Sequence, residues 1–188
     1  MRVLSPTELD RWRAIPAAVM SDEREHRGVL QAIRPLFSGR PFAGQAFTIR
    51  VDATGEPPRI ALGQMAPGAC IVIDARTSPD AAVWGGSLIR IARERGISAV
   101  VVDGNVRDLS DLRDSGLAVC SRGVTPRGPQ WRGTLRQSIH CGGIRIEPGD
   151  LIIGDDDGIV AVPLASATDE LLERCNARIA READGGSA

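Results

Sequence analysis

The apolar positions along the chain follow two periods, one typical of strands and the other of helices. Four short apolar runs rich in β-branched residues predict strands. They cover residues 44–51, 69–75, 98–103 and 117–121. Three intervening stretches carry the pattern of helices. They cover residues 57–65, 84–96 and 107–116. This alternation of elements predicts a mixed α/β domain.

The first residues carry a helix-start signal. Ser5 is followed by proline and, three residues on, by Glu8, which is the pattern of a capping box. We expect the helix to run toward Val19.

The last third of the chain changes character. Residues 142–163 predict three short strands with turns between them, closing the α/β unit with an antiparallel segment. Residues 166–183 predict an amphipathic helix. No linker or repeat divides the sequence, so we expect residues 1–188 to form a single domain.

The composition excludes chemistry that depends on lysine. All 23 basic residues are arginine, and there is no lysine. Schiff-base catalysis and a Walker A phosphate loop both need lysine, so neither is available.

Charge and cysteine spacing narrow the possible functions further. The net charge of −1 gives no electrostatic signal for nucleic acid or a membrane surface. The polar start and the lack of a long apolar run lead us to expect a soluble, cytoplasmic protein. The four cysteines are far apart, without C-x-x-C spacing, which favours buried thiols over a zinc or redox site.

A glycine pair marks the first candidate site. Gly85 and Gly86 precede the predicted helix, so the backbone N–H groups of Ser87 and Leu88 could hold a carboxylate at the positive end of the helix dipole. By itself the pair favours a tight turn.

The second candidate lies at the end of the valine-rich strand. Arg107 could bind a planar carboxylate through two hydrogen bonds, and Asp108 offers the hard oxygen ligand that Mg²⁺ prefers. Asp103 lies nearby on the same strand. Taken alone, the Arg-Asp pair favours a surface ion pair or an acidic residue at a helix N-terminus.

Other polar features are less specific. Residues 154–158 (GDDDG) suggest a metal site but favour a hairpin turn. His26 and His140 lack the spacing of a metal site. The arginine-rich loop at 121–133 could line an anionic pocket or a subunit interface, and the sequence does not separate the two.

Three blocks together resemble a known family. The segments WGGSLIRIARERGISAVVVDGNVRD, VCSRGVTPRGP and IEPGDLIIGDDDGIVAVP are similar, in order and spacing, to the RraA-like family. That family includes the regulator of ribonuclease activity A and 4-hydroxy-4-methyl-2-oxoglutarate aldolases, some of which decarboxylate oxaloacetate. The resemblance covers residues 15–163. It implies a swivelling β/β/α barrel-like domain that assembles as a homotrimer or a hexamer.

The resemblance assigns roles to the candidate residues. In the aldolase branch, the residues that open the helix and the arginine of the Arg-Asp pair bind the 2-oxo acid. The matching positions here are Gly85, Gly86, Ser87, Leu88 and Arg107. The aspartate, here Asp108, holds a divalent metal, Mg²⁺ or Mn²⁺. The implied activity is metal-dependent carbon–carbon cleavage of a 2-oxo acid through a pyruvate enolate.

One position departs from the aldolase pattern. The aldolases have an acidic residue 21 positions before the arginine, where this chain has Gly86. Aldol cleavage needs a base for the 4-hydroxyl proton, whereas decarboxylation does not. We therefore expect oxaloacetate-type decarboxylation to be favoured. Asp103 is a candidate substitute base, as are His140 and an acid such as Glu170 or Glu173 from a neighbouring subunit.

A non-catalytic role is the main alternative. The regulator branch of the family binds and inhibits a ribonuclease. Some of its members lack the metal-binding aspartate, so the presence of both Arg107 and Asp108 favours an enzyme.

Overall fold

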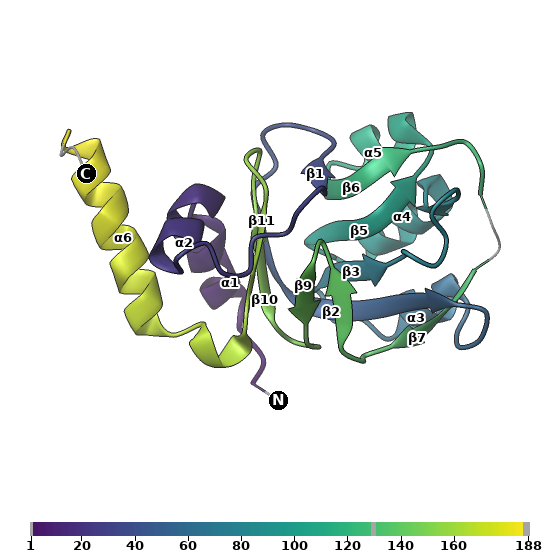
Figure 1. The fold of residues 1–188 in the computed structure, drawn as a ribbon, viewed down its shortest axis with the longest axis horizontal. Coiled ribbons are helices and arrows are strands. Elements are labelled where there is room, and N and C mark those ends of the chain that lie inside the picture. The colour runs from purple at the N-terminus through teal and green to yellow at the C-terminus, as the bar shows by residue number, and fades with distance from the viewer. Residues whose placement is uncertain (1, 129–130, 186–188) are drawn as a thin grey trace.

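The computed structural model describes residues 2–128 and 131–185. Its main sheet contains seven strands in one path and two further strands paired to it (Figure 1). The path runs through β1 (Arg34–Pro35), β6 (Ala118–Val124), β5 (Ala99–Val106), β3 (Cys70–Asp74), β2 (Phe42–Asp52), β10 (Leu151–Gly154) and β11 (Ile159–Val162). The two further strands are β4 (Ala82–Trp84), which pairs with β5, and β7 (Arg132–Leu135), which pairs with β2.

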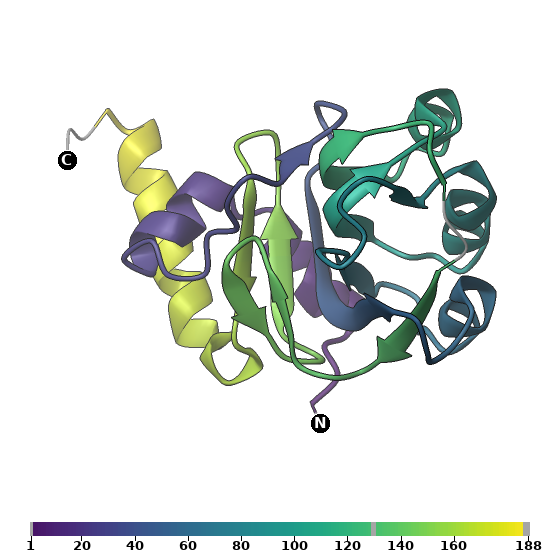
Figure 2. The same cartoon turned by 45° about the vertical axis from the view of Figure 1, so that its right-hand side comes forward.

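The middle of the sheet is parallel and its flanks are antiparallel. β2, β3, β5 and β6 are parallel neighbours, while β10 and β11 form an antiparallel hairpin against β2. The sheet curls into a nearly closed barrel (Figure 2). β3 is buried along its whole length, because parallel strands at the centre of such a sheet are covered on both faces.

Three helices cover one face of the parallel strands: α3 (Pro58–Gly63), α4 (Gly86–Glu94) and α5 (Leu109–Asp114) (Figure 2). Their apolar residues, including Leu62, Ile89 and Leu112, join side chains of the sheet in one core cluster. A second cluster, which includes Val101, fills the opposite face of the strands inside the barrel. The mixed α/β, barrel-like fold expected from the sequence is confirmed.

A second helical layer covers the β10–β11 hairpin at the other end of the molecule. It contains α1 (Pro6–Arg13), α2 (Ala17–Glu23) and α6 (Asp169–Ala183) (Figure 1). A short 3₁₀ turn at Leu164–Ser166 precedes α6. Leu9, Met20 and Leu172 pack with Ile153 and Val160 in a third core cluster. The predicted C-terminal helix is confirmed, three residues shorter at its start.

The expected single N-terminal helix is wrong. The capping box at Ser5 forms as predicted, but α1 ends at Arg13 and α2 begins at Ala17. Pro16 lacks a backbone N–H and disfavours helical geometry in the residue before it, so the chain turns there.

Several short strands escaped the sequence analysis: β1, β4, β7 and β8 (Ile139–Cys141). β9 (Ile144–Ile146), which forms a hairpin with β8, is the first of the three strands expected within residues 142–163.

Two other expectations are confirmed. Asp155–Asp157 lie in the turn between β10 and β11. All four cysteines are buried free thiols, and burial raises the pKa of Cys120 to about 12. Within the described ranges, no helix is long and apolar enough to cross a membrane.

The capping box yields a pH-dependent prediction. The Ser5 backbone N–H donates to the Glu8 carboxylate over 2.8 Å, and the Glu8 N–H donates to the Ser5 hydroxyl over 3.2 Å. The hydrogen bond from the Ser5 backbone is the main cause that lowers the pKa of Glu8 from 4.5 to about 2. The resulting stabilisation is therefore complete above the unfolded-state pKa and is lost as pH falls through the folded-state pKa.

We predict that Glu8→Gln lowers the Tm by a few degrees at pH 7 and that the difference from the parent shrinks between pH 4.5 and pH 2. Thermal unfolding followed by circular dichroism measures both. A difference that stays constant down to pH 2 would contradict the role of the charged carboxylate.

Candidate functional site

The site begins where β5 ends. β4 pairs in parallel with β5, which brings Trp84 opposite Val106, and the Arg107 N–H donates to the Trp84 carbonyl over 2.9 Å. The residues that follow the two strands, Gly85 and Asp108, consequently meet. Segments more than 20 residues apart in sequence thus form one corner of the site.

Asp108 has an unusual backbone conformation. Its φ of 59° and ψ of 51° lie in the left-handed region, which aspartate tolerates better than most residues. The Asp108 carboxylate accepts a hydrogen bond of 2.9 Å from the Gly86 N–H at the start of α4. Residues held in such a sparsely populated conformation cluster at functional sites, so this geometry makes Asp108 a candidate functional residue.

The glycine pair allows this close approach. A Cβ on Gly85 would lie 2.7 Å from Asp108 Oδ2 and 2.9 Å from Arg107 Cγ. Any side chain at position 85 would therefore push the Arg-Asp pair away from the helix. The requirement for glycine here is steric, because Gly85 itself has an extended backbone with φ of −171°.

The N-terminus of α4 offers fewer free donors than the sequence suggested. The Gly86 N–H is taken by Asp108, and the Leu88 N–H donates to the Gly85 carbonyl over 3.1 Å. Among the described residues, the Ser87 N–H has no acceptor. It lies at the positive end of the helix, where a carboxylate oxygen is stabilised both as acceptor and as anion.

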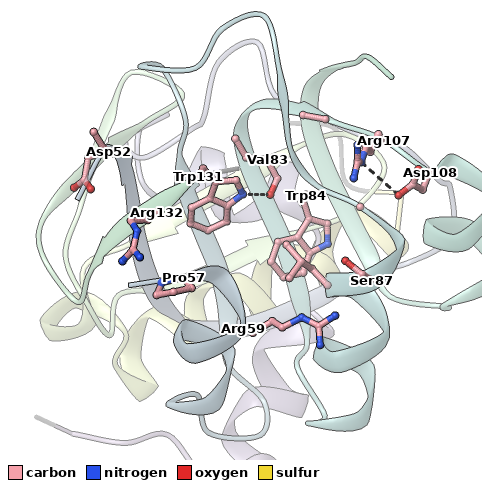
Figure 3. Close-up of a pocket in the computed structure, with 14 residues that line it drawn as sticks. Asp52, Pro57, Arg59, Val83, Trp84, Ser87, Arg107, Asp108, Trp131 and Arg132 are labelled. Carbon is pink, nitrogen blue, oxygen red and sulfur yellow. Dashed lines mark hydrogen bonds and ion pairs between the residues drawn. The ribbon is translucent and has the colours of Figure 1, made fainter. Parts of the chain in front are cut away.

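These residues open onto a pocket of about 610 Å³. Gly85, Ser87, Leu88, Arg107 and Asp108 all line it, so most of the predicted site residues come together (Figure 3).

Arg107 and Asp108 are about half-exposed in the pocket, with Arg107 Nε 3.6 Å from Asp108 Oδ2. A Cβ on Gly128 would lie 2.1 Å from an Arg107 guanidinium nitrogen, so the loop after β6 packs directly against that group. Of this arginine-rich loop, residues 129–130 lie outside the described residues.

Gly86 lies outside this pocket. It borders a second hollow between α4 and α5, where a Cβ on Gly86 would come within 2.0 Å of a carboxylate oxygen of Asp111. The Asp111 carboxylate thus occupies the space next to Gly86 where the aldolase pattern would place an acidic side chain.

Asp103 also lies elsewhere, contrary to the sequence-based expectation. Side chains alternate between the faces of a strand, and Asp103 follows Val101 into the barrel interior rather than the helix-covered face. Its carboxylate is fully buried, accepts a 2.8 Å hydrogen bond from the Gly142 N–H and pairs with Arg122. These contacts leave Asp103 without access to the pocket, so we do not retain it as a base.

For the opposite wall of the pocket, the sequence analysis offered only the loop at 121–133, as one of two possible roles of its arginines. Two tryptophans, Trp84 and Trp131, lie between the Arg-Asp pair and a polar group made of Asp52, Arg59 and Arg132 (Figure 3). The Trp131 indole N–H donates to the Val83 carbonyl over 2.6 Å, which fixes that ring as part of the wall.

Asp108 is the pocket carboxylate best suited to a metal ion. Asp52, the other one, accepts hydrogen bonds from the Thr134 hydroxyl and the Thr54 backbone, and the Thr134 bond is the main cause that lowers the pKa of Asp52. Asp108 Oδ2 has one backbone donor and its side chain is accessible. No group of three or more metal-ligating side chains occurs in the described ranges. A single accessible carboxylate such as that of Asp108 could serve as one of the one or two protein oxygens that Mg²⁺ commonly binds while keeping several waters.

The fold and the pocket define a class: a barrel-like α/β protein in which an arginine, an aspartate and a helix N-terminus line one pocket. The sequence matches the model of the RraA-like family, described as Aldolase/RraA, over residues 14–161. The chain therefore belongs to the RraA-like family.

Individual relatives agree with this assignment. A 4-hydroxy-4-methyl-2-oxoglutarate aldolase of Thermus thermophilus is 30% identical over 147 residues, covering 77% of this chain and 90% of that protein. An uncharacterized protein from Pseudomonas syringae pv. tomato superposes with a TM-score of 0.87 at 26% identity, covering 100% of this chain and 92% of the other. Streptomyces coelicolor RraAS2, of the RNase ES inhibitor RraA family, has the same fold, with a TM-score of 0.86 at 23% identity and coverages of 98% and 97%.

We predict that Gly85→Ala separates Asp108 from the start of α4 without unfolding the protein. Amide hydrogen exchange at Gly86 should accelerate by about tenfold or more, because its hydrogen bond to Asp108 is lost. Gly63→Ala is a matched control, since a Cβ there meets nothing closer than 3.9 Å. Unchanged protection of Gly86 in the Gly85 variant would contradict the steric argument.

Proposed function

We propose that this protein is a divalent-metal-dependent carbon–carbon lyase acting on 2-oxo acids. The main support is that Arg107, Asp108 and the free Ser87 N–H converge on one pocket. The aldolase name of the Thermus relative agrees with a lyase. The reactions we propose are decarboxylation of oxaloacetate and aldol cleavage of the 4-hydroxy-4-methyl-2-oxoglutarate type.

The chain's own residues would bind the 2-oxo acid end of the substrate. The Ser87 N–H would donate to one carboxylate oxygen at the positive end of α4. The Arg107 guanidinium would donate to the second carboxylate oxygen and to the keto oxygen, for which its planar donor geometry is suited. These contacts would hold the reacting bond in a fixed orientation beside Asp108.

Asp108 would hold the ion, Mg²⁺ or Mn²⁺, through its accessible carboxylate oxygen. When bound, such an ion supplies positive charge that stabilises the oxyanion developing at the keto group. The Gly86 N–H fixes the Asp108 carboxylate in place, so its orientation is set before any ligand arrives.

Both reactions break the bond between C3 and C4 and leave the bond electrons on the enolate of pyruvate. In decarboxylation CO₂ departs, and in aldol cleavage the departing fragment is a carbonyl compound. Arg107 would stabilise the enolate oxygen electrostatically in either case. A lysine imine is unavailable, because the chain has no lysine.

The residue at position 86 supports decarboxylation over aldol cleavage. Aldol cleavage needs a base for the 4-hydroxyl proton, and Gly86 supplies none. Asp111 lies beside Gly86 but does not line the pocket. The regulator role known for other RraA-type proteins is the alternative, and the following test separates the two.

We predict that pyruvate forms from oxaloacetate in the presence of Mg²⁺ or Mn²⁺, and that EDTA abolishes the reaction. Asp108→Asn should lower kcat/KM by about 100-fold, because the amide keeps the hydrogen bond to Gly86 but loses the charge that holds the ion. Pyruvate is measured with a coupled dehydrogenase assay against free metal as background.

Asp114→Asn is the matched control, since Asp114 is exposed on α5 outside the pocket. Full activity of the Asp108 variant in excess EDTA would contradict the site. Absence of turnover with both oxaloacetate and 4-hydroxy-2-oxo diacids would favour the regulator alternative.

A further inference from the structure

A second pocket lies at the opposite end of the molecule from the Arg-Asp pair. Its volume is about 510 Å³, which is in the size range of small-molecule sites. Its walls are the end of α2 with the loop that follows it and the start of α6, which lie side by side in Figure 1. It shares no lining residue with the pocket beside the end of β5, so it is a separate candidate site.

The charged groups that line this second pocket are mostly paired with one another. They belong to three arginines and three glutamates. Arg174 Nε lies 3.2 Å from Glu23 Oε2, and Arg174 Nη2 donates to the Glu23 carbonyl over 2.8 Å. Arg27 pairs with Glu25. One arginine and one glutamate remain.

Arg24 is the remaining cation. It is partly buried, and its Nε makes only a long hydrogen bond of 3.4 Å to the Arg27 carbonyl. The carboxylate of Asp150 acts on it from a distance but accepts hydrogen bonds from the Glu147 and Leu164 backbone N–H groups. Burial and, after it, the charge of Arg27 lower the pKa of Arg24. A carboxylate bound in the pocket would stabilise this charge.

Glu170 is the remaining anion. It is exposed in the first turn of α6, and across the part of the chain that the structure describes no basic side chain forms an ion pair with it, Arg24 included. Ser166 and Thr168 add hydroxyl groups near the start of α6, and Leu171 adds apolar surface. The pocket therefore presents a cation on the side of α2 and an anion on the side of α6.

We infer that the second pocket binds a zwitterion, a small molecule with one carboxylate and one ammonium group, such as an α-amino acid. The Arg24 guanidinium would donate two hydrogen bonds to the carboxylate, and the Glu170 carboxylate would accept from the ammonium group. A simple anion would be repelled by Glu170 and a simple cation by Arg24, so the pair of charges selects a ligand that carries both. This site is independent of the activity proposed above.

The test uses L-leucine as the probe, because Pro163 and Leu171 supply apolar surface for its side chain. Two analogues each lack one charge: 4-methylpentanoate has no ammonium group, and 3-methylbutylamine has no carboxylate. Binding to the full chain is measured by titration calorimetry. The parent protein should bind leucine about 10- to 100-fold more tightly than either analogue, the range expected when a hydrogen bond to a charged group is lost.

Two variants assign the two charges separately. Arg24→Gln should weaken leucine about tenfold or more without weakening 3-methylbutylamine, which offers Arg24 no carboxylate. Glu170→Gln should weaken leucine but leave the affinity for 4-methylpentanoate unchanged or higher. Because Glu170 is exposed, its variant is expected to fold even where Arg24→Gln lowers the Tm.

Arg181→Gln is the matched control, since it removes an exposed charge from α6 outside the pocket, and its affinity for leucine should equal that of the parent. Absence of leucine binding at millimolar concentrations would overturn the inference. Equal binding of leucine and both analogues, or a Glu170→Gln variant that binds leucine as the parent does, would overturn it as well.

Discussion

The pairing of β4 with β5 is the constraint on which the rest of the site depends. It sets the Trp84 carbonyl against the Arg107 N–H and so aligns the start of α4 with the end of β5. Buried valines hold β5 rigidly in the parallel sheet, and the Gly86 N–H then fixes the Asp108 carboxylate. A rigid strand end of this kind suits chemistry that requires groups placed to within a fraction of an ångström.

Electrostatics explain why this corner suits an anion. The free end of α4 contributes partial positive charge, and Arg107 adds a full one. Asp108 balances part of that charge, and in the proposed function its carboxylate would hold the divalent cation. The pocket is lined by residues of β2, β4, β7, α3 and α4 and by the residues that follow β5, so segments far apart in the sequence build it.

The sequence predicts the parts of the site that are local. Gly85, Ser87, Leu88, Arg107 and Asp108 were recognised because a glycine-led helix start and a charged strand end each leave a short pattern, and the family resemblance joins the two. Arg59, on α3, was missed. Trp131 and Arg132 belong to the loop at 121–133, for which the sequence left a pocket and a subunit interface open. Arg132 reaches the pocket through the pairing of β7 with β2, a contact between strands about 80 residues apart that no local pattern records.

Asp103 was expected at the site, and the structure places it elsewhere. It is close to Arg107 in sequence, yet strand alternation directs it into the barrel, where Arg122 and the Gly142 N–H satisfy its carboxylate. The break at Pro16 was also visible in the sequence, but the capping box and the apolar spacing around it favoured one continuous helix. Fold class and the strands of the parallel centre were more predictable because long apolar runs specify them, whereas the order of the strands in the sheet was not predicted.

The most direct test of the central claim is a crystal structure of the protein with Mn²⁺ and oxalate, a planar mimic of the pyruvate enolate. The account predicts that the anomalous signal of manganese lies beside the Asp108 carboxylate and that oxalate accepts hydrogen bonds from the Ser87 N–H and the Arg107 guanidinium. Oxalate and manganese bound away from the end of β5, or an empty pocket at saturating concentrations of both, would contradict it.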